Sequence, residues 1–225
     1  MDTAGNVYTV NTDSETVSKS TPAGASTIFG TTGNAPVAIA IDVNGNVYTA
    51  NVDSDTVSKI TAGGISTILG ITGSGPRDLT VDMDGNVYTA NQDSDDVSKI
   101  APDGTTTTLG TTGAGPRGIA LDADGNIYTA NRDTDNVSKI TPDGNSATLG
   151  ATALRPRGIA VDTYGNVYTS STASNTLSKI TDTSTATFAA TGDTSPITIT
   201  GLTNDTEYLM SLIAVNDAGE SAASN

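Results

Sequence analysis

A unit of 40 residues recurs along most of this chain without an insertion or a deletion. The clearest copies, Gly45–Asn51, Gly85–Asn91 and Gly125–Asn131, read GNVYTAN, GNVYTAN and GNIYTAN, and weaker copies begin at Gly5 and Gly165. A fixed period of this length indicates one supersecondary unit stacked on copies of itself, because a single unit cannot bury its own apolar face. The repeat therefore decides the architecture, and it says much less about activity.

Each unit divides into four short segments rich in β-forming residues. In residues 76–115 the expected strands are 76–81, 86–90, 97–100 and 106–109. Turn-forming Asp, Pro and Gly residues lie between them, and no segment has the spacing of a capped amphipathic helix. Four antiparallel strands in 40 residues is typical of a propeller blade. We therefore predict an all-β fold, a β-propeller of four-stranded antiparallel blades.

The register of the repeats predicts how the ring closes. Complete four-strand sets begin at Pro36, Pro76, Pro116 and Pro156, whereas the opening copy lacks its first strand. Residues 196–200 place Pro196 in step with these prolines and would supply that strand. We predict five blades closed by this C-terminal segment, with a six-bladed arrangement as the alternative, because closure removes exposed sheet edges.

The predicted propeller covers residues 1–200, with repeats that start near residues 2, 42, 82, 122 and 162. Residues 201–225 resemble the C-terminal part of a fibronectin type III domain but hold too few strands for a sandwich of that class. A degenerate partial blade is the alternative, because Tyr208 is in repeat register with Tyr168. Near-identical blades also allow blade exchange between chains or a homo-oligomer.

The repeat resembles the NHL and virginiamycin-B-lyase-like propellers. The resemblance rests on PRGIALD at 116–122, DGNIY at 124–128 and VSKITPDG at 137–144, and it covers roughly residues 1–190. It implies the fold more than the function, because that family is functionally broad. The resembling lyases use a His as catalytic base, and the lactonase relatives hold a divalent metal with Glu, Asn and Asp. This chain has no His and no Glu at such a place, so neither activity carries over.

The composition of the chain limits the classes of partner that it can be expected to bind. The formal net charge is −15, from 25 acidic and 10 basic residues, which disfavours nucleic acid and anionic membranes. No apolar run approaches the length of a membrane span, so we expect no membrane insertion. There is no Cys, and the chain starts at Met1 inside a repeat without a signal peptide. We expect an extracellular or cell-surface location as part of a larger protein, with boundaries that are either natural or engineered.

Two acidic groups are candidate metal sites. Carboxylate and amide oxygens in the turns between the first two strands can hold Ca²⁺, and the residues concerned are Asp42, Asn44, Asp82, Asp84, Asp122 and Asp124. The alternative is a hairpin turn, which the early Gly favours, so no cofactor is expected. A second group, in the loops between the second and third strands, includes Asp53, Asp93 and Asp133. Its side chains are expected to satisfy local backbone donors.

Arg77, Arg117 and Arg157 each follow the proline that opens a unit. The loops that bear them converge at the mouth of a propeller channel, where such proteins place ligands. Three guanidinium groups can hold a carboxylate or a sulfated sugar there, and pairing with the neighbouring Asp loops is the alternative. The ring is incomplete, because Val37 and Ile197 occupy the other two positions.

The sequence favours a non-catalytic scaffold or binding module of a secreted or surface protein. It would present multivalent weak sites for carbohydrate or protein. No ordinary catalytic set is present, because Ser lacks a His base. A lyase or lactonase-type enzyme with a divalent metal at the channel mouth is the first alternative. A designed or amplified propeller without a ligand is the second.

Overall fold

The computed structural model describes residues 1–181, 215–216 and 219–220. The chain divides into two units, Met1–Thr181 and Asp182–Asn225. In the second unit the described residues form one antiparallel pair, β19 (Val215–Asn216) with β20 (Gly219–Glu220). The other residues of that unit, including the predicted closing strand at 196–200, lie outside the described residues. The blade count, the fibronectin-like segment and the boundary at residue 200 therefore stay predictions.

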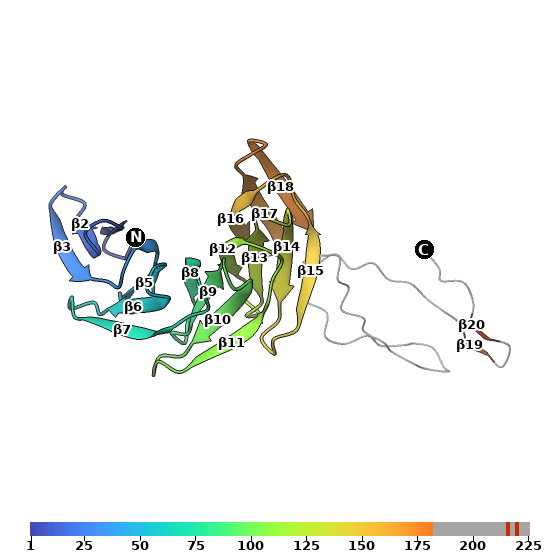
Figure 1. Cartoon of the computed structure of the whole chain (residues 1–225), viewed down its shortest axis with the longest axis horizontal. Helices are drawn as coiled ribbons and strands as arrows, with labels where there is room; N and C mark the ends of the chain where they lie inside the picture. Colours follow the sequence, from blue (N-terminus) through green and yellow to red (C-terminus); the bar gives the residue numbers. More distant parts are fainter. Residues whose placement is uncertain (182–214, 217–218, 221–225) are drawn as a thin grey trace. The chain divides into compact units, whose positions relative to one another are not determined.

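The first unit consists of five antiparallel sheets that follow one another along the chain (Figure 1). Sheet 1 comprises β1 (Val7–Asn11), β2 (Thr16–Ser20) and β3 (Ser26–Thr31). Sheet 2 comprises β4 (Pro36–Ile41), β5 (Val47–Asn51), β6 (Thr56–Ile60) and β7 (Ser66–Ile71). Sheet 3 comprises β8 (Pro76–Val81), β9 (Val87–Asn91), β10 (Asp96–Ile100) and β11 (Thr106–Thr111). Sheet 4 comprises β12 (Pro116–Leu121), β13 (Ile127–Asn131), β14 (Asn136–Ile140) and β15 (Ser146–Ala151). Sheet 5 comprises β16 (Pro156–Val161), β17 (Asn166–Ser171) and β18 (Thr176–Thr181).

This arrangement confirms the predicted fold class. The strands expected in residues 76–115 lie within two residues of β8, β9, β10 and β11, and sheet 1 lacks a first strand, as predicted. The first strands β4, β8, β12 and β16 contact one another in order, whereas the last strands touch the next sheet only slightly. The sheets therefore converge on their first strands and splay outward, which is the radial packing of a propeller. The described residues contain no helix, and hence none that could cross a membrane.

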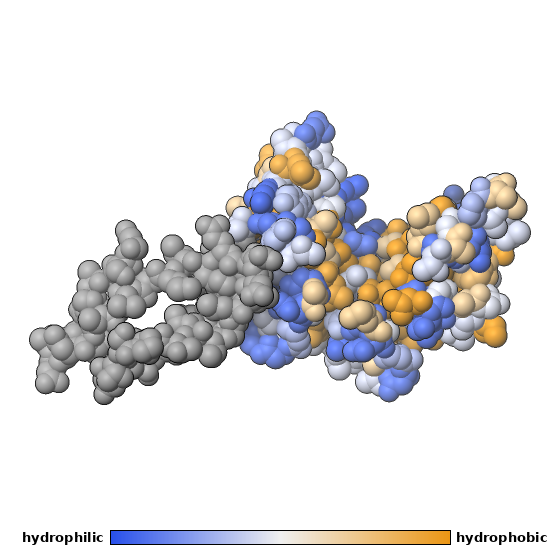
Figure 2. Space-filling model, turned by 180° about the vertical axis from the view of Figure 1, so that it is seen from behind, coloured by the Kyte–Doolittle hydropathy of each residue, from blue (hydrophilic) through white to orange (hydrophobic). Residues whose placement is uncertain are grey.

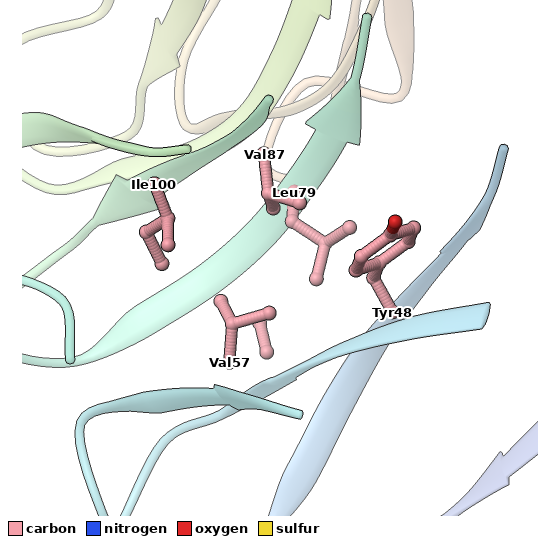
Figure 3. Packing of buried hydrophobic residues seen from close by; sticks show 6 residues of the cluster. Tyr48, Val57, Leu79, Val87 and Ile100 are labelled. Atoms are coloured by element: carbon pink, nitrogen blue, oxygen red, sulfur yellow. The ribbon is translucent and has the colours of Figure 1, made fainter. Parts of the chain in front are cut away.

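Neighbouring sheets pack through complementary apolar faces. Figure 3 shows Tyr48 and Val57 of sheet 2 facing Leu79, Val87 and Ile100 of sheet 3, and all of these side chains are buried. Alternation along each strand makes this possible, because successive residues point to opposite faces of a sheet. The equivalent residues of the next sheets form the same kind of cluster. The core is thus a series of similar layers between sheets rather than one central mass.

The terminal sheets each leave one of these faces uncovered by the described residues. Val7 on sheet 1 is 50 % exposed, whereas its counterpart Val47 is fully buried. Leu177 on sheet 5 is 71 % exposed, whereas its counterpart Val97 is fully buried. The interior interfaces show that such positions are suited to packing against another sheet.

The missing first strand of sheet 1 leaves a shallow hollow between that sheet and sheet 2. Its lining residues are Met1, Tyr8, Ile39, Ala40 and Ile41. On the face that Figure 2 shows, hydrophobic residues also lie between the two raised ends of the first unit.

The layered core predicts a large effect of a single truncation. Ile100→Ala removes a fully buried side chain from the interface of sheets 2 and 3, and we expect the free energy of unfolding to fall by about 2–5 kcal/mol. Ile68→Ala is the control, because Ile68 is 55 % exposed, and its effect should stay within about 0.5 kcal/mol. Urea unfolding of both variants measures the difference. Equal small effects would contradict the packing described.

Candidate functional site

The turns between the first two strands of each sheet are closed by one carboxylate. Asp42 Oδ1 accepts hydrogen bonds from the backbone N–H groups of Asn44 and Asn46 at 2.9 and 2.8 Å. Its Oδ2 accepts from Asn46 Nδ2 at 2.7 Å and from the Tyr48 hydroxyl at 3.0 Å. Gly45 has a φ of 79°, which suits glycine at this point of the turn. The same bonds recur at Asp2, Asp82, Asp122 and Asp162.

These bonds set the electrostatics of the turn. Burial pushes the pKa of Asp42 upward, but the hydrogen bonds from Asn46, Tyr48 and Asn44 outweigh it and hold the pKa below its ordinary value. Burial, reinforced by Asp42, raises the pKa of Tyr48. Lys59 Nζ lies 5.6 Å from the centre of the Tyr48 ring, a cation–π contact found in every sheet. The repeated lysines therefore cover the tyrosine rings.

The acidic turns are occupied by internal hydrogen bonds. A cation at Asp42 would have to replace the four donors that this carboxylate already accepts. Among the described residues, no group of three or more His, Cys, Asp or Glu side chains is placed to hold a metal ion. Calcium at these turn residues stays the alternative to the hairpin turns that the sequence favours.

On the opposite rim, acidic side chains fix the loops that lead into the next sheet. Asp55 accepts a hydrogen bond from the backbone N–H of Gly75 at 2.8 Å, and Asp95 accepts one from Gly115 at 2.8 Å. Asp55 and Asp95 have φ values of 51° and 54°, in the left-handed region that Asp tolerates better than most residues. These carboxylates bind local backbone donors, and they hold the loop that immediately precedes each arginine.

A buried amide network supports the same loops. Asn91 is fully buried; its Nδ2 donates to Ser98 Oγ at 2.9 Å, and its Oδ1 accepts from Thr89 Oγ1 at 2.9 Å. Ser98 Oγ in turn accepts a hydrogen bond from the backbone N–H of Gly73 at 2.9 Å. The connection from sheet 2 to sheet 3 is thereby tied to the interior of sheet 3. The rim is a braced surface rather than a set of free loops.

The arginines of the predicted ring occupy β-bulges. The pairing of β8 with β9 runs from Pro76↔Asn91 to Asp78↔Ala90, so Arg77 is an extra residue on the inner strand. The same shift recurs at Arg117 and Arg157, and at Val37 in sheet 2. A bulge re-aims the side chain of its extra residue away from the normal alternation. The same β-bulge therefore occurs at the arginine position of sheets 3, 4 and 5.

The arginine cluster lacks acidic partners. The Nε atoms of Arg77 and Arg117 are buried and have no hydrogen-bond acceptor among the described residues. A salt bridge joins Arg132 to Asp133 at 2.7 Å. Burial, followed by the charges of Arg157, Arg77 and Arg132, lowers the pKa of Arg117, and Asp133 opposes this. These guanidinium groups therefore lie close enough to repel one another, and the predicted pairing with the Asp loops is not seen at Arg77 or Arg117.

Arg132 and Gln92 were not singled out by the sequence. They occupy the same repeat position, and their backbone N–H groups donate to the carbonyl oxygens of Gly115 and Gly75, both at 2.9 Å. Gln92 Oε1 is also buried and without a donor in the described part of the chain. Both residues therefore border the loops that carry the arginines.

Asp78 breaks the repeat on the inner strands, where the other sheets have Ala38, Gly118 and Gly158. Its Oδ2 accepts a hydrogen bond from the backbone N–H of Ile119 on β12 at 3.0 Å, and its Oδ1 accepts from Leu79 at 2.9 Å. Burial raises its pKa to about 6 despite these two bonds. Asp78 thus joins two inner strands, and the departure from the repeat was visible in the sequence.

The fold and these rims define a β-propeller with braced, polar loops at one end of its inner strands. Residues 1–211 match the virginiamycin B lyase family, so the chain belongs to that family. No curated protein matches the chain at a significant level.

Solved structures agree on the fold. Virginiamycin B lyase from Staphylococcus aureus superposes with a TM-score of 0.67 at 16 % identity, covering 80 % of this chain and 68 % of the lyase. The nidogen/laminin complex contains a chain with a TM-score of 0.68 at 16 % identity, covering 80 % of this chain and 73 % of the other. A third match is a catalytically inactive S. aureus lyase with quinupristin, in which one histidine is replaced by alanine (TM-score 0.66, 16 % identity, 81 % and 68 % covered). The chain thus spans about two thirds of these lyases.

Asp78 gives a pH prediction. An acid whose pKa is higher in the folded than in the unfolded state binds more protons when folded, so stability falls as the pH rises from about 4 to about 6. We expect Asp78→Asn to gain on the wild type by on the order of 2 kcal/mol in unfolding free energy over that range, because the variant has no charge to bury.

Urea unfolding at several pH values measures this difference. Asp84→Asn removes the same charge from an exposed turn and so reports the effect of net charge alone. Parallel curves for Asp78→Asn and the wild type would contradict the raised pKa.

Proposed function

We propose that this chain is a non-catalytic binding module of a secreted or cell-surface protein. It would bind a carbohydrate or a protein through the rim that carries the arginine cluster, Arg77, Arg117 and Arg157. The observation that carries this proposal is the unpaired cationic group on a rim whose loops are braced by Asp55, Asp95 and the Asn91 network. Braced loops with free donors suit recognition, because less ordering is required on binding.

Two comparisons support a binding role over lyase chemistry. The lyase variant lacking one histidine is described as catalytically inactive, and this chain has no histidine. A chain of the nidogen/laminin complex has a similar fold, so a fold of this shape occurs in a complex between two proteins. Similar sheets also present similar surfaces side by side, which favours several weak contacts acting together.

Binding and turnover measured side by side test this proposal. We expect the intact chain to bind saturably to at least one class on an array of neutral, sialylated and sulfated glycans and purified laminin, and to leave quinupristin unchanged. Arg77→Gln should weaken the captured signal, because it removes one donor group from the rim. Breakdown of quinupristin, with no array member bound, would overturn the proposal in favour of the enzyme alternative.

A further inference from the structure

We propose that the arginine cluster binds a single oxyanion, a carboxylate, sulfate or phosphate group carried on an otherwise neutral ligand. This inference deepens the proposed function, because it names the chemical group that the rim recognises. It starts from the β-bulges, which place Arg77, Arg117 and Arg157 at one repeat position of three consecutive sheets. The inner strands approach closely there: a Cβ on Gly118 would lie 2.2 Å from the carbonyl oxygen of Arg157.

The donors are present and unused. The buried Nε–H groups of Arg77 and Arg117 have no acceptor in the described part of the chain, although buried polar groups in native proteins are nearly always hydrogen-bonded. A guanidinium presents its N–H groups as a planar fork that matches the oxygens of a carboxylate, sulfate or phosphate. An oxyanion between the arginines would supply the missing acceptors to both side chains.

The local charge points the same way. The positive charges of Arg157, Arg77 and Arg132 act together on Arg117, and Asp133, which opposes them, is itself paired with Arg132. Like charges held near one another are costly unless a counter-ion neutralises them. One bound anion would relieve that repulsion without any change of fold.

The surrounding acids limit the size of the anion. The loops that carry Asp55 and Asp95 contact the loops leading to the arginines through Gly75 and Gly115. Acidic side chains on these loops share the rim with the cluster, so a polyanion such as heparin would meet repulsion around a small cationic centre. One terminal oxyanion on a neutral sugar or peptide fits this pattern of charge.

Arginine Nε NMR tests the inference directly, because the chain has only five arginines. The intact ¹⁵N-labelled chain is titrated with sulfate, phosphate, acetate or methyl glucuronide at constant ionic strength, with chloride as the reference. We expect the Nε–Hε signals of Arg77 and Arg117 to shift saturably with at least one oxyanion. Linear shifts of all five signals, equal to those in chloride, would overturn the proposal.

Matched variants separate binding from folding. Arg117→Gln should weaken the affinity for the bound oxyanion by about 10-fold or more, since it removes a charge-assisted donor group. It should not lower the unfolding midpoint of the free protein, because the Nε group of Arg117 has no hydrogen bond to lose. Lys99→Gln, which removes one positive charge from β10, where Lys99 lies over the Tyr88 ring, should change the affinity by less than about 2-fold.

Three results would contradict this account: unchanged oxyanion affinity in Arg117→Gln, equal losses in both variants, and heparin fragments that bind more tightly than single anions. Failure of this inference can be distinguished from failure of the proposed function. Binding of a neutral glycan or of laminin without any oxyanion effect would preserve the module and remove this site.

Discussion

The contact between one sheet and the next is the interaction on which the whole structure depends. Tyr48 and Val57 on one face meet Leu79, Val87 and Ile100 on the following face, and the same arrangement repeats along the chain. The apolar burial in these layers supplies most of the stability. Because the sheets converge on their first strands, the same packing fixes the rims on which the charged loops lie.

The rims differ because their polar groups are used differently. On one rim, Asp42 and its counterparts accept all the donors around them, so the turns close on themselves. On the other rim, Asp55 and Asp95 hold the connecting loops, while Arg77 and Arg117 keep buried donors unpaired. Among the described residues, hydrogen-bonded carboxylates thus close the turns of one rim, whereas buried arginine Nε groups without acceptors lie at the other.

Much of the fold could be predicted from the sequence because the repeat fixes both period and register. Residues 76–81 read as a strand, and β8 covers that same segment. The shared place of the arginines in the fold could also be predicted, since Arg77, Arg117 and Arg157 each follow the proline that opens a unit. The β-bulge could not, because one extra residue in a pairing is a property of two strands together. The sequence shows that Asp78 departs from the repeat. Its hydrogen bond with Ile119 could not be predicted, because Ile119 lies on the neighbouring sheet.

Crystals grown with selenate, a heavier analogue of sulfate, test the central claim most directly, because anomalous scattering locates selenium without reference to the protein. The account predicts a selenate between the arginines, within hydrogen-bond distance of the Nε atoms of Arg77 and Arg117. Arginines paired with the loop carboxylates, and no anomalous peak beside them, would contradict it.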